Sequence, residues 1–210
     1  MIISNGVYVL KEKAEVVMYG VVIVGGGPAG LSCALTLADG ARRFDFARKP
    51  IAVVDSGSSD VLKAVLNNVP GVKRGTTGEE YLEFLRAQVE EFEEVNLIEG
   101  EVAEVTGREG EFKVVLSDGR ELQAELVVFA TGFHSFPVKT DLVEVVPHPK
   151  SPRPGKIALR PKAPGVYVAG LAAGVITMVA SAAGSGVEVA CDILSKWAGR
   201  VVVGHDKIGG

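Results

Sequence analysis

Short apolar runs alternate along the chain with amphipathic stretches, which is the pattern of an α/β fold. Four runs are apolar and β-branched for long enough to be buried parallel strands, at residues 21–24, 51–54, 125–130 and 165–170. Helical spacing of apolar residues predicts helices beginning near Leu31, over 76–94 and over 177–197. Further strands are predicted at 97–106, 111–117 and 121–129, with turns between them, and the segment 147–164 is predicted to be a proline-rich connector.

These elements predict one α/β domain with a Rossmann-like arrangement. The central parallel sheet is expected to carry helices on one face and a three-stranded β-meander on the other. We expect the domain to cover residues 18–200, with an N-terminal extension at 1–17 and a C-terminal tail at 201–210. A natural start at Met18 would leave the extension without a role.

Composition and charge narrow the range of functions. The 210 residues carry a net charge of −4 with no basic tract, which argues against nucleic acid as a partner.

Cys33 and Cys191 form neither a C-x-x-C motif nor a metal cluster, so both are predicted to be buried small apolar residues. Residues 165–187 are uncharged but interrupted by glycines, which favours a buried strand and helix over a membrane span. With no secretory signal visible, we expect a soluble cytoplasmic protein.

The most specific motif is a glycine cluster directly after the first strand. The strand at 21–24 runs into G-x-G-x-x-G, and a helical pattern follows. Gly25 is expected to allow a tight turn, Gly27 to let the backbone approach a pyrophosphate, and Gly30 to let the helix pack closely on the strand. Pro28 suits the first helical turn, where its missing N–H costs little. The order of strand, glycines and helix favours a dinucleotide site over a simple glycine turn.

A second strand, at 51–54, ends in Asp55 and supports this interpretation. A carboxylate at this position can accept hydrogen bonds from an adenosine ribose, and it would repel a 2′-phosphate. The polar segment 39–50 explains why Asp55 lies further from the glycines than usual. A turn residue before Ser56-Gly57-Ser58 remains the alternative interpretation of Asp55.

Taken in order, these pieces resemble the FAD-binding half of thioredoxin reductase-like flavoproteins. The matching segments run in family order and cover nearly everything from residue 18 to 197. They are Gly25-Gly26-Gly27-Pro28-Ala29-Gly30, Asp55, Asn68-Val69-Pro70-Gly71, Phe129-Ala130-Thr131-Gly132, Gly165-Val166-Tyr167-Val168-Ala169-Gly170 and Ala182-Ala183-Gly184-Ser185-Gly186. The chain looks most like the short, single-domain proteins related to thioredoxin reductase.

The resemblance implies FAD as the cofactor and a set of residues that hold it. The pyrophosphate would lie on the glycine loop, the adenosine ribose at the end of the second strand, and the adenine by the main chain of Val102. The flavin and its ribityl chain would lie near Asn68, the residues after the last strand, and the start of the last helix, whose dipole would stabilise negative charge on the ring. The implied site residues are Gly25, Gly27, Pro28, Ala29, Gly30, Asp55, Ser56, Asn68, Val102, Thr131, Gly132, Gly170, Leu171, Met178 and Val179.

Two departures from the family pattern bear on function. Leu171 stands where the family has an aspartate that bonds the ribityl chain or phosphate, and loss of that bond would cost about 1.5–3 kcal/mol of binding. The family also inserts a complete NADPH domain with a C-x-x-C after the Ala-Thr-Gly strand. Only about 33 residues separate Thr131 from Gly165, too few for such a domain. A complete thioredoxin reductase activity is therefore not expected.

Three functions remain open at this point. The first is an FAD-dependent oxidoreductase that receives electrons from NAD(P)H, a partner protein or a small substrate. No catalytic side chain is assigned; His134 is the best polar candidate near the cofactor, and a solvated or packed loop residue is the alternative interpretation of it. The second is a non-catalytic FAD-binding module, sensor or subunit, whose partner would meet Phe133, Phe136, Leu142 and Val143, unless these residues cover the domain's own sheet. The third is an NAD-binding protein. A homodimer is a further expectation, based on fold analogy alone.

Overall fold

The computed structural model describes residues 17–202, so the predicted extension at 1–17 and tail at 201–210 lie almost wholly outside the described residues. One sheet of seven strands forms the centre. In spatial order its main path is β5 (Val95–Glu99), β2 (Ile51–Asp55), β1 (Met18–Val24), β8 (Glu121–Phe129), β7 (Phe112–Leu116) and β6 (Val102–Thr106). A seventh strand, β11 (Val166–Val168), pairs with β8 outside this path.

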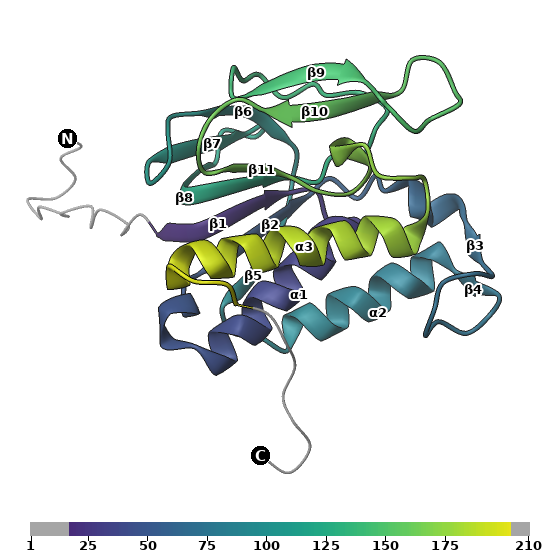
Figure 1. Ribbon diagram of the computed structural model, residues 1–210, viewed down its shortest axis with the longest axis horizontal. Helices are drawn as coiled ribbons and strands as arrows, with labels where there is room; N and C mark the ends of the chain where they lie inside the picture. The colour runs from purple at the N-terminus through teal and green to yellow at the C-terminus, as the bar shows by residue number, and fades with distance from the viewer. Residues whose placement is uncertain (1–16, 203–210) are drawn as a thin grey trace, which may run out of the picture.

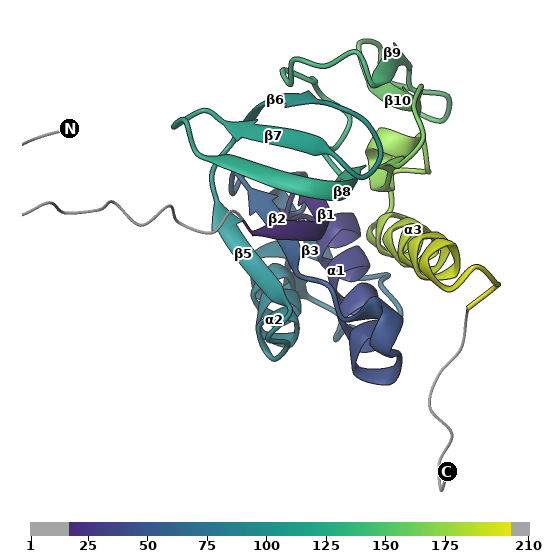
Figure 2. The same cartoon turned by 90° about the vertical axis from the view of Figure 1, so that its left-hand side faces the viewer.

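The sheet is parallel at one end and antiparallel at the other because β8 has two sets of neighbours. This strand pairs in parallel with β1 over residues 123–129 and, through its C-terminal end, with β11, where Val168 lies opposite Phe129. Its N-terminal half pairs antiparallel with β7, where Phe112 lies opposite Ala124. The predicted meander is therefore a continuation of the parallel sheet, and Figure 2 shows β6 and β7 curling over β1 and β2.

Helices cover one face of the sheet, and the meander covers the other (Figure 1). The helices are α1 (Pro28–Arg43), α2 (Gly78–Glu90) and α3 (Val179–Ala198), and α1 packs against both of the others. Because side chains alternate along β1, Val21 and Ile23 pack with the helices, while Val22 and Val24 pack with the meander. The expected α/β arrangement, with helices on one face and the meander on the other, is confirmed.

Two regions differ from the sequence prediction. The single strand predicted at 97–106 is two strands, β5 and β6, because the chain turns at Gly100, whose φ of +156° favours glycine. The predicted connector at 147–164 contains most of a hairpin formed by β9 (Val143–Pro147) and β10 (Ile157–Pro161). Short elements complete the fold: η1 (Asp45–Ala47), η2 (Asp60–Lys63), β3 (Val65–Leu66), β4 (Thr76–Thr77) and η3 (Gly170–Ala173).

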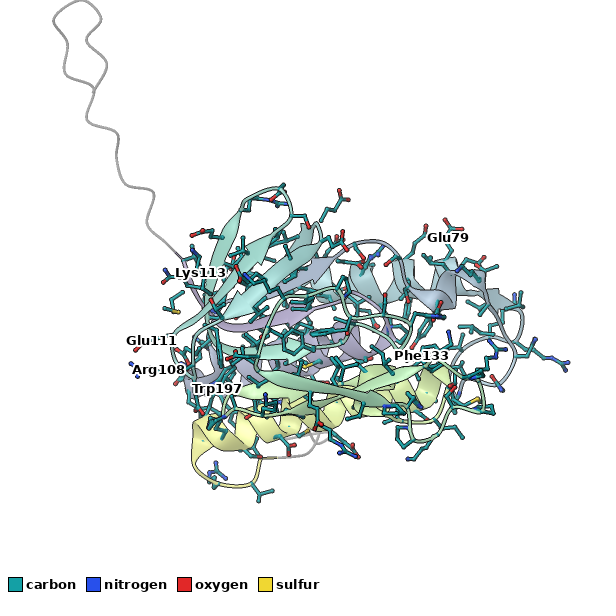
Figure 3. All side chains as sticks on the ribbon, turned by 90° about the horizontal axis from the view of Figure 1, so that it is seen from above. Glu79, Arg108, Glu111, Lys113, Phe133 and Trp197 are labelled. Carbon is teal, nitrogen blue, oxygen red and sulfur yellow. The ribbon has the colours of Figure 1, made fainter. Side chains whose placement is uncertain are left out.

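The apolar residues after β8 do not form the exposed partner surface that the sequence suggested. Leu142 and Val143 are buried in the core under the meander, Phe133 is buried beside the ring of His148, and the half-buried Phe136 packs edge-on against Phe129. Phe133 lies beside the start of β10, where its carbonyl oxygen accepts a hydrogen bond from the N–H of Ile157 at 2.9 Å (Figure 3). These side chains stabilise the domain itself, so the prediction of a docking surface made of them was wrong.

Both cysteines are free thiols on packed helices. Cys33 of α1 is fully buried and Cys191 of α3 is half-buried, and burial raises the pKa of each thiol. Neither is therefore a ready thiolate nucleophile. Across residues 17–202, no helix is long and apolar enough to cross a membrane.

Candidate dinucleotide-binding site

A cleft opens at the carboxyl ends of the parallel strands, where open α/β sheets bind their ligands. Its walls come from segments far apart in the sequence: the ends of β1, β2 and β8, the segment after β2, the turn after β5, and the region from η3 to the start of α3. Hydrogen bonds hold the strand ends together, from the Gly25 N–H to Val54 O and from the Ala130 N–H to Val24 O, each 2.8 Å long. The topology thus brings most of the predicted site into one place.

Each glycine after β1 is favoured at its position for a different structural reason. Gly25 has a φ of +114°, and a side chain there would collide with the carbonyl group of Ala130. A side chain on Gly30 would collide with the carbonyl oxygen of Gly25, so Gly30 allows α1 to pack directly on the loop. Gly27 is different, because only the Ser59 hydroxyl would lie near its Cβ, at 3.1 Å. Gly27 leaves space that belongs to the cleft rather than to the packing of the fold.

Two helices begin at the cleft without a side-chain cap. Gly27 is the N-cap of α1 and Met178 is the N-cap of α3, and neither helix start has a side-chain hydrogen bond to its first N–H groups. By contrast, α2 has a complete capping box in which Thr77 and Glu80 satisfy each other's backbone N–H groups. The N-terminal ends of α1 and α3 therefore offer backbone donors and positive dipole ends to an anionic ligand in the cleft.

Asp55 ends β2 and presents its carboxylate to the cleft beside the glycine loop. Its Oδ1 accepts a hydrogen bond from the Gly57 N–H at 3.0 Å, and its Oδ2 accepts one from Arg86 Nη2 at 2.5 Å. A side chain on Gly26 would occupy the space of this carboxylate, so the middle glycine makes room for Asp55. The alternative interpretation of Asp55, as a turn residue, is also met, because the Gly57 N–H donates to its carboxylate. Asp55 nevertheless lines the cleft.

Thirteen of the fifteen predicted site residues line this cleft. They are Gly25, Gly27, Pro28, Ala29, Asp55, Ser56, Val102, Thr131, Gly132, Gly170, Leu171, Met178 and Val179. Gly30 lies behind the loop, where it serves packing. Asn68 is exposed in the bend after β3 and is not among the lining residues, so its proposed place beside the flavin stays a prediction.

Sequence reasoning missed the wall formed by the segment after β2 and by the loop after Gly132. These residues are Ser58, Ser59, Asp60, Val61, Ala64, Ser135, Pro137 and Val138. No local motif marks them, although their closeness to Asp55 and Thr131 in the chain is a weak signal. They face each other only because β2 and β8 end at the same edge of the sheet.

His134 joins the two sides of this wall through a chain of hydrogen bonds. Lys156 Nζ lies 2.5 Å from His134 Nδ1, and His134 Nε2 lies 2.5 Å from Asp60 Oδ2. An ammonium group is a donor only, so Nδ1 is the acceptor and the Nε2–H donates to Asp60. The Phe133 ring supports the chain, with the Lys156 ammonium 4.9 Å from its centroid. Of these polar residues, His134 and Asp60 line the cleft.

Leu171 and its neighbours form the end of the cleft near α3. Gly170 has a φ of +69°, and a side chain there would collide with the Cβ of Ala29, so η3 approaches α1 closely. The Gly170 N–H donates to Ser185 Oγ at 3.0 Å, which ties η3 to α3. Leu171 lines the cleft with an apolar side chain and supplies no hydrogen bond to a ligand there.

These features fit a long dinucleotide such as FAD better than a small ligand. The cleft offers a glycine cradle for phosphates, a carboxylate for a ribose, and two helix N-terminal ends placed along its length. Within residues 17–202, no group of three or more histidine, cysteine or acidic side chains is placed to hold a metal ion.

Solved structures with this fold include thioredoxin reductases. A thioredoxin reductase from Gloeobacter violaceus matches with a TM-score of 0.69 and 17% identity, over 92% of this chain and 100% of that chain. An oxidoreductase from Agrobacterium tumefaciens matches with a TM-score of 0.67 and 18% identity, over 84% and 97%. The atypical thioredoxin reductase TRi from Desulfovibrio vulgaris Hildenborough matches with a TM-score of 0.64 and 16% identity, over 86% and 98%. At these identities the likeness concerns the fold.

No curated protein sequence matches the chain. The family model for pyridine nucleotide-disulphide oxidoreductases matches residues 19–138, more than half of the chain, from β1 to the loop after β8. This segment contains the glycine loop, Asp55 and the Ala130-Thr131-Gly132 turn, which carry most of the cleft. The protein therefore belongs to the pyridine nucleotide-disulphide oxidoreductase family.

Proposed function

We propose that the protein is an FAD-dependent oxidoreductase whose electrons come from a separate donor, either NAD(P)H or a partner protein. The observation that carries the proposal is the placement of two uncapped helix N-terminal ends and a glycine cradle along one cleft. FAD, when bound, supplies the chemistry of transferring two electrons as a hydride equivalent. Family membership and the fold of thioredoxin reductases support this assignment.

Each part of the cleft would have a separate task in holding FAD. Backbone groups at Gly25, Gly27 and Ala29 would bind the pyrophosphate, because their N–H groups and the α1 dipole favour negative charge. Asp55 would accept hydrogen bonds from the adenosine ribose. The N-terminal end of α3 at Met178 and Val179 would face the flavin, where its dipole favours electron-rich forms of the ring.

The proposal of a separate electron donor rests on the segment between β8 and β11. At the point where the resemblance implies an inserted NADPH domain, the chain forms the β9–β10 hairpin. The two cysteines lie on packed helices with raised pKa values, so they do not suit a redox-active disulfide at the flavin. We infer that a donor reaches the cleft from outside this domain.

His134 is the titratable side chain best placed to exchange a proton with a substrate. It lines the cleft, its Nε2–H is oriented by Asp60, and Lys156 approaches its other ring nitrogen. Because both ring nitrogens are engaged within the chain, a substrate would have to displace Lys156 or Asp60 before His134 could act as a general acid or base. This role of His134 extends the proposed function and does not affect the binding of FAD.

An anaerobic titration of the purified protein with NADH and NADPH tests the proposal. Loss of the oxidised flavin absorbance with either nucleotide, followed by its return with an acceptor, is the expected result. A flavin that stays oxidised with both nucleotides and with reduced protein donors would favour the non-catalytic module. A colourless protein that takes up no FAD but is stabilised by NAD would overturn the proposal in favour of an NAD-binding protein.

We further propose a homodimer and a cytoplasmic location. Three exposed apolar side chains, Leu62, Val65 and Phe84, come from η2, β3 and α2 and would suit burial against a second copy. Two free cysteines suit a reducing compartment. Size-exclusion chromatography with light scattering, repeated on Phe84→Glu, would test the dimer, because a monomeric wild-type protein would contradict it.

A further inference from the structure

The carboxylate of Asp55 is held by an arginine from a different part of the fold. Arg86 of α2 donates through Nη2 to Asp55 Oδ2 at 2.5 Å, across 31 positions in the sequence. The pair is partly shielded from water, since the exposed fractions of the two side chains are 37% for Arg86 and 18% for Asp55. The Gly57 N–H fixes the other carboxylate oxygen at 3.0 Å. Asp55 is thus held at both oxygens.

This arrangement leaves part of the carboxylate available to a ligand. The two oxygens of an ionised aspartate together offer about four acceptor positions. One position on each oxygen is used, so about two remain for hydroxyl groups. Asp55 lines the cleft while Arg86 does not, and the carboxylate lies against the backbone of Gly26. The free positions are therefore directed at a ligand bound along the glycine loop.

We propose that Arg86 sets the adenosine specificity of the cleft. It positions Asp55 to accept hydrogen bonds from the ribose hydroxyls, and Asp55 in turn keeps the guanidinium away from a 2′-phosphate. Removal of the carboxylate would free a planar donor group at the same place, and such a group binds phosphate well. This proposal rests on the proposed function in one respect. It requires that an adenosine diphosphate group binds at the glycine loop.

The first test compares ADP with 2′-deoxy-ADP by calorimetry. Wild-type protein is expected to bind ADP at least tenfold more tightly, because 2′-deoxy-ADP lacks one hydrogen bond to a charged acceptor. In Arg86→Met this preference should fall below threefold, while Arg86→Lys should retain part of it. The matched control is Glu83→Gln on the same helix, which should keep the full preference. If Arg86 only stabilises the fold, both ligands will weaken equally, and that result would overturn the proposal.

The second test uses ADP-ribose and 2′-phospho-ADP-ribose as probes of the freed guanidinium. Asp55→Asn should shift the ratio of their affinities at least tenfold toward the 2′-phosphate, and Asp55→Asn with Arg86→Met should abolish that shift. An unchanged ratio in Asp55→Asn would contradict the proposal. Because none of these probes contains flavin, the specificity can be confirmed even if FAD fails to bind. A wild-type protein that retains FAD but binds ADP and 2′-deoxy-ADP equally would overturn this proposal and leave the proposed function standing.

Discussion

Replacement of Gly27 by valine should remove cofactor binding and leave the fold intact. Gly27 has φ −81° and ψ −173°, which any residue can adopt, and its Cβ would meet only the Ser59 hydroxyl, at 3.1 Å. Rotation of the Ser59 side chain relieves the contact with the Cβ, but valine is a poorer N-cap than glycine, so we expect the free energy of unfolding to fall by about 1 kcal/mol. The added side chain would instead fill the space where a phosphate meets the backbone.

The expected loss of affinity follows from the bonds that the valine side chain displaces. A hydrogen bond to a charged group contributes about 1.5–3 kcal/mol, and loss of two such bonds would weaken FAD binding about 10²- to 10⁴-fold. Fluorescence titration with FAD measures this affinity, and urea unfolding measures the stability of the same samples. The prediction requires a large change in the first and a small change in the second.

Two glycine controls separate binding from folding. Gly184 of α3 faces open space and does not line the cleft, so Gly184→Ala should change neither FAD affinity nor the fold. Gly30→Val should destabilise the protein itself, because its side chain would collide with the carbonyl oxygen of Gly25. A Gly27→Val protein that retains wild-type FAD affinity would refute the assignment of this loop to the pyrophosphate.

Three further predictions test other parts of the account. Leu171→Asp restores the polar group that the resemblance implies, so FAD should bind about 10- to 150-fold more tightly by fluorescence titration, and a weaker affinity would contradict the implied ribityl contact. His134→Gln should slow steady-state turnover with NAD(P)H by at least about tenfold while FAD affinity stays within threefold; unchanged turnover would exclude the acid–base role. Burial raises the pKa of Cys33, so its contribution to stability is complete below the usual thiol pKa of about 8.5 and is lost as the pH rises above it. Urea unfolding between pH 8 and 11 should therefore show a smaller decline in Cys33→Ala than in the wild-type protein.

Local sequence patterns were enough to predict the elements that place the glycine loop. The apolar run of β1 and the glycines after it depend on residues a few positions apart, so the printed sequence contains them. The resemblance to thioredoxin reductase-like flavoproteins, built from such segments, is confirmed by the family match and the fold. Thirteen of the residues that the resemblance implies line one cleft, although their binding of FAD stays a prediction.

Contacts between distant segments could not be predicted in the same way. The pairing of Arg86 with Asp55 depends on how α2 packs beside the end of β2, and the chain from Lys156 to Asp60 depends on where a hairpin returns to the sheet. The prolines in 147–164 favoured the prediction of a connector. Edge strands tolerate proline at their ends, so these prolines are compatible with the hairpin that is present. Such contacts arise from tertiary packing, which has no local period.

The most direct test is the flavin content of the protein after natively purified material is saturated with FAD and freed of excess by gel filtration. We predict one FAD per chain, measured by absorbance and by mass spectrometry of the intact complex, and far less in Gly27→Val. The claim that this cleft is an FAD site would be contradicted if the folded wild-type protein retained no flavin under these conditions. The control variant Gly184→Ala should then also be folded and free of flavin.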